Sequence, residues 1–313
     1  MRNILTLVVL LLAVVSGFLV WTMLPFRVTV TEMSLPAQFP PQQPPAGMSL
    51  SILPTGKMIA DEMSAYRGGS PLRKYDSGMA AVLIRHPRGD LLIDSGFGSK
   101  APEHVLTTPL LMQLMASAEY GVPAAQQLQT AGYDLDDLKG IVLTHAHWDH
   151  VSGLPDFAGT PVWVNEPERQ FIIHGDEHSA LARSMTGTDW QVFEYTETPY
   201  MGFPNSLDWH GDGSVVLVPL NGHTPGSTGV FIHLPSGKRY FLIGDLAWMI
   251  EGIERPAERP FLARRMVDGD PLLVRQMLGH VHQLARQFPD LVVVPAHDAR
   301  VHARMPAFPD SES

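Results

Sequence analysis

The sequence contains no cysteine. This absence excludes disulfide bonds, lipoprotein anchoring, metal sites built from thiolates, and cysteine nucleophiles. It does not decide the compartment, because many exported proteins also lack disulfide bonds. The chemistry of this chain must therefore come from side chains other than cysteine.

Basic residues are few. The 313 residues include 22 Lys and Arg against 32 Asp and Glu, which gives a formal net charge of −10. Nucleic-acid backbones are bound by basic faces, so this charge predicts that the chain has no nucleic-acid partner. The hydrophobic share of 45% is ordinary for a globular protein and allows a sizeable core. We find no internal repeat, and the length fits one large domain or two small ones.

Charge is also missing from the N-terminal run Ile4 to Leu24. At about 1.5 Å per residue, a helix of that length spans a bilayer core of roughly 30 Å. No good cleavage site follows it, because Ser16-Gly17 lies inside the apolar run. We therefore expect residues 1–27 to form an uncleaved membrane anchor, with the rest of the chain outside the cytoplasm, in the periplasm or at the cell surface. The alternative is a cleaved signal segment and a secreted protein.

Proline dominates residues 28–47, which show no sustained periodicity. The prolines of this segment are Pro36, Pro40, Pro41, Pro44 and Pro45. This composition predicts a stiff, extended linker that lifts a folded domain, residues 48–313, off the membrane.

The richest motif is His145-Ala146-His147-Trp148-Asp149-His150, which follows the apolar run 140–143. The run reads as a buried strand, so the motif begins where a strand ends. In an extended segment alternate side chains point the same way, which places His145 and His147 together. After a turn, Asp149 and His150 reach a second point nearby. Imidazole and carboxylate ligands suit zinc, manganese or iron(II).

Three later strand ends repeat this arrangement. The predicted strands 215–219, 239–243 and 291–294 each lead into a loop with Gly or Pro, and these loops carry His223, Asp245 and His297. The strand 239–243 is expected to form a hairpin with 229–234. The remaining histidines have no such setting and are predicted to be surface or capping residues: His86, His104, His174, His178, His210, His233, His280, His282 and His302.

Other elements follow from local patterns. Strands are expected at 49–53, 79–85, 91–93 and 162–164, and helices at 110–120, 122–131, 166–174 and 271–288. The Met-rich face of 110–120 is expected to be core, with a flexible lid over an apolar substrate as the alternative. No elements are assigned to 175–213.

Together these motifs resemble the metallo-β-lactamase superfamily of hydrolases, over roughly residues 48–300. The resemblance implies an αββα sandwich, an α/β fold in which two facing sheets carry helices outside and metals at one edge. It implies that His145, His147 and His223 hold one metal, that Asp149, His150 and His297 hold a second, and that Asp245 bridges them. The metals would be two Zn²⁺ ions, with iron or manganese as alternatives, and they would share a hydroxide nucleophile. Asp149 would orient the hydroxide and carry a proton. Asp94 would either accept a ring N–H from a ligand histidine or simply form a turn.

The substrate predicted from these features is a small-molecule ester, lactone or related bond. Quorum-quenching lactonases share the ligand spacing but usually carry a tyrosine where this chain has Trp248. True β-lactamases often use a cysteine ligand, and glyoxalase II enzymes carry a basic C-terminal domain, so both resemble this chain less. Two other hypotheses stay open, a phosphodiesterase of the same fold and a di-iron redox or metal-sensing module. The sequence predicts no oligomeric state.

A basic loop raises one further question. Its arginines are Arg255, Arg259, Arg264 and Arg265. They would either clamp a carboxylate or phosphate, or, as we favour, pair with the acids Glu251, Glu254, Glu258 and Asp268.

Overall fold

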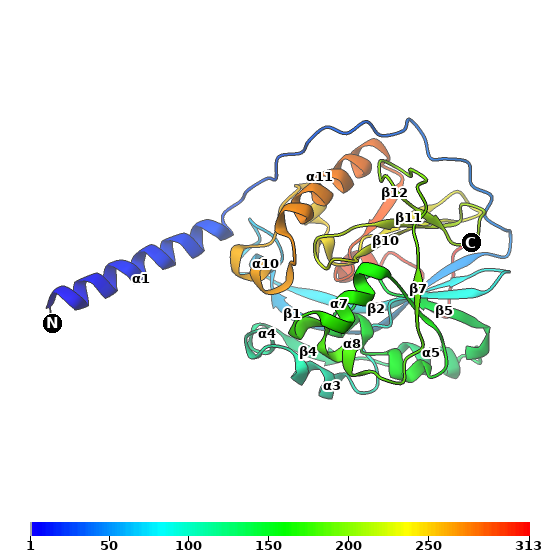
Figure 1. The fold of residues 1–313 in the computed structure, drawn as a ribbon, viewed down its shortest axis with the longest axis horizontal. Coiled ribbons are helices and arrows are strands. Elements are labelled where there is room, and N and C mark those ends of the chain that lie inside the picture. Colours follow the sequence, from blue (N-terminus) through cyan, green and yellow to red (C-terminus); the bar gives the residue numbers. More distant parts are fainter. Residues whose placement is uncertain (1) are drawn as a thin grey trace.

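Two β-sheets form the centre of the domain in the computed structural model, which describes residues 2–313 (Figure 1). One sheet has seven strands in the order β4-β1-β2-β3-β5-β6-β7, and the other has five in the order β12-β11-β10-β9-β8. The strands of the first sheet are β1 (Ser49–Asp61), β2 (Lys74–Arg85), β3 (Asp90–Ile93), β4 (Ser117–Tyr120), β5 (Leu138–Val142), β6 (Val162–Asn165) and β7 (Trp190–Phe193). Those of the second are β8 (Leu207–Asp208), β9 (Val215–Pro219), β10 (Thr228–His233), β11 (Arg239–Leu242) and β12 (Leu291–Val294).

Helices cover the outer face of each sheet. The described helices are α1 (Arg2–Met23), α2 (Glu62–Ala65), α3 (Ala101–His104), α4 (Leu110–Met115), α5 (Ala124–Thr130), α6 (Trp148–Val151), α7 (Glu166–His174), α8 (Ala180–Ser184), α9 (Glu251–Glu254), α10 (Phe261–Val267), α11 (Pro271–Gln287) and α12 (Ala299–His302). Successive residues of a strand point to opposite faces. In β9, Leu217 packs between the sheets, whereas Val216 and Val218 pack in the layer that includes Leu278 and Val281 of α11. The predicted four-layer sandwich is therefore confirmed.

Two local predictions were wrong. The helix expected over 110–120 ends at Met115, and Ser117–Tyr120 is a strand that pairs with Gly56–Ile59 of β1. Pairing with β1, which is distant in the sequence, decides this conformation, and the local pattern does not indicate that partner. The face of this segment is also not core, since Leu110 and Leu114 are exposed.

Several histidines expected at the surface are buried. His86, His233, His280 and His302 are each less than a tenth exposed. Each has a polar partner that compensates for burial: Nε2 of His280 donates to the Met201 carbonyl at 2.9 Å, and that of His302 to the Pro295 carbonyl at 3.1 Å.

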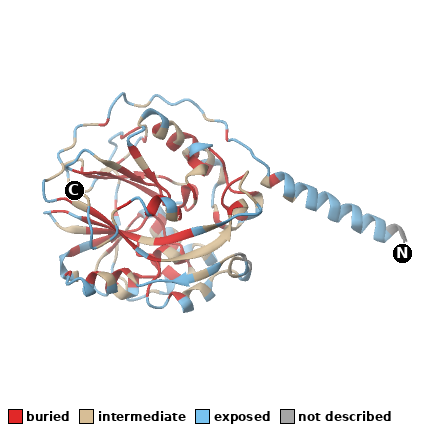
Figure 2. Ribbon diagram, turned by 180° about the vertical axis from the view of Figure 1, so that it is seen from behind, coloured by how far each residue is buried: buried red, intermediate tan, exposed pale blue. Residues whose placement is uncertain are grey.

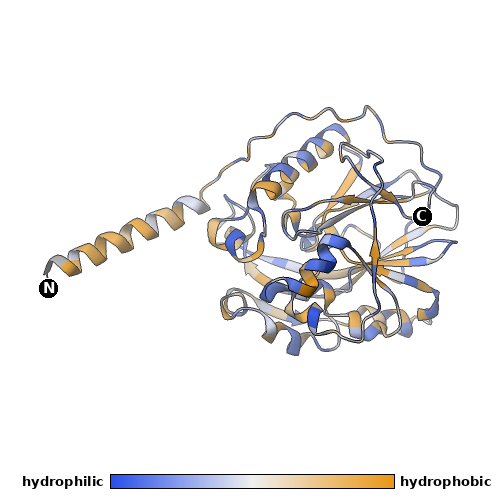
Figure 3. Cartoon of the chain, viewed as in Figure 1, coloured by the Kyte–Doolittle hydropathy of each residue, from blue (hydrophilic) through white to orange (hydrophobic). Residues whose placement is uncertain are grey.

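The N-terminal helix α1 projects from the domain and is exposed along almost its whole length (Figures 1 and 2). Its side chains are predominantly apolar (Figure 3). The stretch Ile4–Met23 is long and apolar enough to cross a membrane, by length and composition alone, a test that a signal sequence also passes.

The proline-rich segment does not stand free as a spacer. It is extended, as expected, but it crosses α11 and continues round the domain (Figure 1). Gln283 of α11 donates to the Thr31 carbonyl at 2.7 Å, and Phe39 packs against Phe231 and Phe288. An apolar ring within the segment thus finds a partner on the five-stranded sheet, which the sequence pattern did not indicate.

Candidate metal centre

All the predicted ligands meet at one edge of the sandwich, because each follows the end of a strand. His145 and His147 lie between β5 and α6, and α6 carries Asp149 and His150. His223 follows β9 and His297 follows β12. Asp245 follows β11 in the 3₁₀ turn η5 (Gly244–Leu246).

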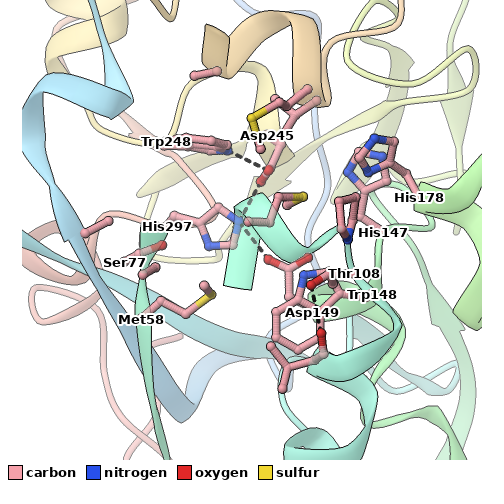
Figure 4. A pocket seen from close by; sticks show the side chains of 18 of the residues that line it. Met58, Ser77, Thr108, His147, Trp148, Asp149, His178, Asp245, Trp248 and His297 are labelled. Carbon is pink, nitrogen blue, oxygen red and sulfur yellow. Dashed lines mark hydrogen bonds and ion pairs between the residues drawn. The ribbon is translucent and has the colours of Figure 1, made fainter. Parts of the chain in front are cut away.

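The ligand atoms form three overlapping groups. Within each group the ligand atoms lie within 4.8 Å of one another. The first group is His145, His147 and His223, the second is His145, His150 and Asp245, and the third is Asp149, His150 and His297. In Figure 4, Asp149 and Asp245 both face the ring of His297. The Nε2 atom of His297 lies 3.3 Å from Oδ2 of Asp149 and 2.9 Å from Oδ1 of Asp245.

Asp245 occupies the position between the outer groups. Its Oδ1 lies 3.3 Å from Nε2 of His150, and its Oδ2 lies 3.5 Å from Nε2 of His223. The residue before it, Gly244, has φ +49°, and a Cβ there would lie 3.0 Å from the side chain of Thr144. Both the positive φ and the close contact favour glycine at this position, where it lets Asp245 approach the histidine loop closely.

Buried polar atoms without partners converge on the same point. Nε2 of His145, Nε2 of His150 and Oδ1 of Asp245 make no hydrogen bond of good geometry among the described residues, although Oδ1 of Asp245 lies at ion-pair distance from His297 and His150. A buried polar atom left in this state costs about 1–3 kcal/mol, and a divalent cation would satisfy several at once. Burial holds the pKa values of His145 and His147 well below the ordinary value, which favours the neutral rings that ligate metals. The donor set therefore fits a pair of metal ions.

Outer partners fix the orientation of the rings. Asp94 accepts a hydrogen bond from Nδ1 of His150 at 2.8 Å, as predicted, and also accepts one from the backbone N–H of Thr144 at 2.7 Å. Burial alone would lower the pKa of His150. The nearby carboxylates of Asp94 and Asp149 have the larger effect, and they raise the pKa of His150 well above its ordinary value. Nδ1 of His297 donates to the Gly78 carbonyl at 3.1 Å.

The basic loop follows the favoured interpretation at Arg259 and Arg264, which pair with acids. Asp268 bonds both Nδ1 of His223, at 3.0 Å, and Arg259, at 2.8 Å. Arg259 also donates to the Asp245 carbonyl, and Arg264 pairs with Glu258 at 2.5 Å. These two guanidinium groups are therefore engaged within the protein. Asp298 is the N-cap of α12, and its side chain accepts a hydrogen bond from the backbone N–H of Arg300.

No motif in the sequence pointed to Glu168. Its carboxylate is buried and accepts hydrogen bonds from Ala146 N–H at 2.7 Å, Thr224 Oγ1 at 2.6 Å and Gly226 N–H at 3.0 Å. It therefore ties the loop of His145 and His147 to that of His223. Burial raises its pKa to about 7.

A cavity opens over the candidate metal centre (Figure 4). Asp149, His147, Asp245 and His297 contribute to its lining, which is otherwise mostly apolar. The apolar lining residues include Met58, Val105, Met112, Trp148, Trp248, Met266 and Val267. Trp248 donates from Nε1 to Oδ2 of Asp245 at 2.8 Å. His178, expected at the surface, also lines the cavity, with its ring 5.5 Å from that of His147.

Known proteins match this chain over most of its length. The family model described as "Metallo-beta-lactamase superfamily" matches residues 79–297. A probable metallo-hydrolase of Mycobacterium tuberculosis is 31% identical over 234 residues, which cover 69% of this chain and 73% of the relative. An N-acyl homoserine lactonase of Bacillus thuringiensis is 22% identical over 268 residues, covering 83% and 97%.

Solved structures share the fold. An N-acyl homoserine lactone hydrolase with the product N-hexanoyl-L-homoserine bound at its catalytic metal centre superposes with a TM-score of 0.67 and 20% identity, covering 84% of this chain and 98% of that one. The dizinc quorum-quenching lactonase AidC gives a TM-score of 0.55 and 16% identity, covering 86% and 90%. The predicted family resemblance and the predicted class, a hydrolase of this fold, are confirmed.

Proposed function

Because the chain belongs to the metallo-beta-lactamase superfamily, we propose that it is a dinuclear zinc hydrolase that cleaves an ester, lactone or related bond of a small molecule. The observation that carries the proposal is the position of Asp245, whose two carboxylate oxygens face different histidines at the centre of the ligand groups. The lactonases among its relatives support the choice of bond.

We assign His145, His147 and His223 to one metal, Asp149, His150 and His297 to the other, and Asp245 to both. This assignment follows the first and third ligand groups, and Asp245, which forms the second group with His145 and His150, would be shared between the two ions. Two divalent cations would supply a hydroxide nucleophile near neutral pH and would polarise the carbonyl of the substrate. Nitrogen and carboxylate donors in this ratio suit Zn²⁺, and iron or manganese are the alternatives that metal analysis distinguishes.

The protein side chains have separate tasks. Asp149 faces the cavity and would orient the nucleophile and receive its proton. Trp248 holds Oδ2 of Asp245 by a hydrogen bond and presents an apolar ring to the substrate. Its indole is a poor acid, so the leaving alcohol would take its proton from Asp149 instead. The apolar walls would exclude water and select substrates with an apolar group.

Two features argue against a phosphodiester substrate. One is the mostly apolar lining of the cavity, and the other is the lack of a free cation on the basic loop at Arg259 and Arg264. Arg259 and Arg264 are paired with Asp268 and Glu258, so neither offers a free cation to a phosphate.

We further propose that residues 1–27 anchor the enzyme in a membrane without cleavage, that 28–47 connect the anchor to the hydrolase domain 48–313, and that the domain lies outside the cytoplasm. Hydrogen bonds from Arg67 to the carbonyls of Trp21 and Leu24 support an anchor that stays attached, because they join the end of α1 to the domain. A mature protein that begins after residue 27, as determined by N-terminal sequencing, would contradict this.

A substrate panel on the full-length enzyme in detergent tests the activity. We expect kcat/KM for lactones or aryl esters to exceed that for bis(p-nitrophenyl) phosphate, and a chelator to abolish both. His147→Ala should lose hydrolysis while its circular dichroism spectrum stays that of the wild type. A larger kcat/KM for the phosphodiester, or unchanged turnover in His147→Ala, would overturn the proposal.

A further inference from the structure

The end of α1 is bound to the domain beside the cavity. The ring of Phe18 contacts Phe261, the first residue of α10, with 5.2 Å between centroids. At 1.5 Å per residue, Phe18 lies about 7.5 Å inside the end of α1 at Met23. If Ile4–Met23 spans a bilayer core of roughly 30 Å, the start of α10 therefore lies near the boundary between the acyl chains and the lipid headgroups.

Polar contacts hold α1 in this direction. Arg67 donates to the Trp21 carbonyl at 2.9 Å and to the Leu24 carbonyl at 3.2 Å, and its guanidinium lies 3.5 Å from Glu258. The backbone N–H of Gly68 donates to the Met23 carbonyl at 2.9 Å. These bonds satisfy carbonyls that the end of a helix leaves unpaired, so α1 is joined to the domain by more than a flexible tether.

Exposed leucines stand next in sequence to residues that line the cavity, and they are here named the leucine rim: Leu106, Leu110, Leu114 and Leu262. Leu110 and Leu114 of α4 are 69% and 75% exposed, and Leu262 of α10 is 42% exposed. The neighbouring residues Met112 and Met266 line the cavity from α4 and α10, so the two helices border the same opening. Both lie on the side of the domain from which α1 projects (Figure 1).

We propose that the leucine rim lies in the lipid interface and that the substrate enters the cavity from the membrane. Exposed apolar side chains on segments that border one cavity are costly in water, and contact with lipid offsets that cost. The bilayer is the occupant that the structure favours, because the apolar helix α1 ends beside α10 and the rim. The exposed cations Arg27 and Arg265, one just beyond α1 and the other on α10, would add attraction to anionic headgroups.

This position implies a class of substrate, and that part of the inference rests on the proposed function. A bond cleaved at the metal centre would belong to an amphiphile that partitions into the bilayer, with an apolar chain attached to the ester or lactone. The apolar walls between the rim and the metal ligands would keep that chain out of water during entry.

The absence of cysteine allows a direct test of the surface. Single variants Leu110→Cys, Leu262→Cys and Val192→Cys of the full chain would each carry one environment-sensitive fluorophore in vesicles of phosphatidylethanolamine and phosphatidylglycerol. Val192 is the matched control, because it is also an exposed apolar residue but lies on β7, at the sheet edge opposite β4. We expect a nitroxide-labelled lipid to quench the probes at 110 and 262 several-fold more than the probe at 192. Equal quenching at all three positions would overturn the proposal.

A second measurement tests entry from the membrane. For each variant we compare kcat/KM for a dodecanoyl ester in vesicles with that for the butanoyl ester in solution. Leu110→Glu with Leu262→Glu should lower this ratio about tenfold, whereas Val192→Glu should keep it. An unchanged ratio in the double variant would overturn entry from lipid. Quenching as expected without hydrolysis of any ester or lactone would support the lipid-facing surface and overturn the proposed function instead.

Discussion

The carboxylate of Glu168, on α7, accepts a hydrogen bond from the backbone N–H of Ala146 at 2.7 Å. Ala146 lies between two of the proposed ligands, and the other oxygen of Glu168 binds Thr224, next to His223. A single buried side chain therefore sets the separation of two ligand loops that are far apart in the sequence.

Replacing Glu168 with Gln should loosen this connection. The amide offers one acceptor where the carboxylate offers two, so one loop loses its partner at a cost of about 1–3 kcal/mol. We expect kcat/KM to fall roughly 10–100-fold, because groups that position ligands are worth that much to metal sites. Glu166→Gln is the matched control, since Glu166 lies on the same helix but is exposed. Equal kcat/KM in the two variants would show that Glu168 has no positioning role.

Trp248→Phe should weaken retention of the metals. The substitution keeps an apolar ring in the cavity but removes the N–H that binds Oδ2 of Asp245. A hydrogen bond to a charged group contributes about 1.5–3 kcal/mol, so the chelator concentration that removes half the metal should fall roughly 10–100-fold. The control Trp190→Phe alters a tryptophan on β7, outside the cavity. The role assigned to Trp248 fails if both variants lose metal at the same chelator concentration.

Strand ends were the informative part of the sequence. The convergence of three ligands, His223, Asp245 and His297, on the histidine motif could be predicted, because each follows an apolar strand that ends at the same edge of the sandwich. All three lie at that edge. The partnership of Glu168 with Ala146 could not be predicted, since it joins a helix to a loop through tertiary packing alone. The strand at Ser117–Tyr120 escaped prediction for a similar reason, because its partner in β1 lies far away in the chain.

The buried histidines show the same limit. His233 and His280 resemble surface residues in the sequence, and only the folded chain brings them to Tyr200 and Met201. A periodic pattern records which side of an element faces the core. It does not record which distant polar atom will compensate for a buried ring.

His233 should make stability fall with acid. Burial lowers its pKa to about 3, against about 6.5 in the unfolded chain. The unfolded state therefore binds more protons below pH 6.5, and the folded state loses stability as the pH falls from there toward 3, by up to about 1.4 kcal/mol per pH unit.

His233→Gln keeps an acceptor for the Tyr200 hydroxyl, which lies 2.7 Å from Nε2 of His233, and removes the titration. We expect the free energy of unfolding, measured by chemical denaturation, to fall between about pH 7 and about pH 5 by about 2 kcal/mol less in the variant than in the wild type. The same loss of stability in both proteins would contradict this account.

Elemental analysis of the purified full-length protein tests the central claim, a dinuclear metal centre, most directly. The arrangement of three ligand groups around Asp245 predicts about two metal ions per chain, mainly zinc. His147→Ala should retain fewer, because it removes a ligand from one of the two proposed sites. A wild-type content near zero, in protein never exposed to chelator and supplied with zinc during expression, would contradict the account.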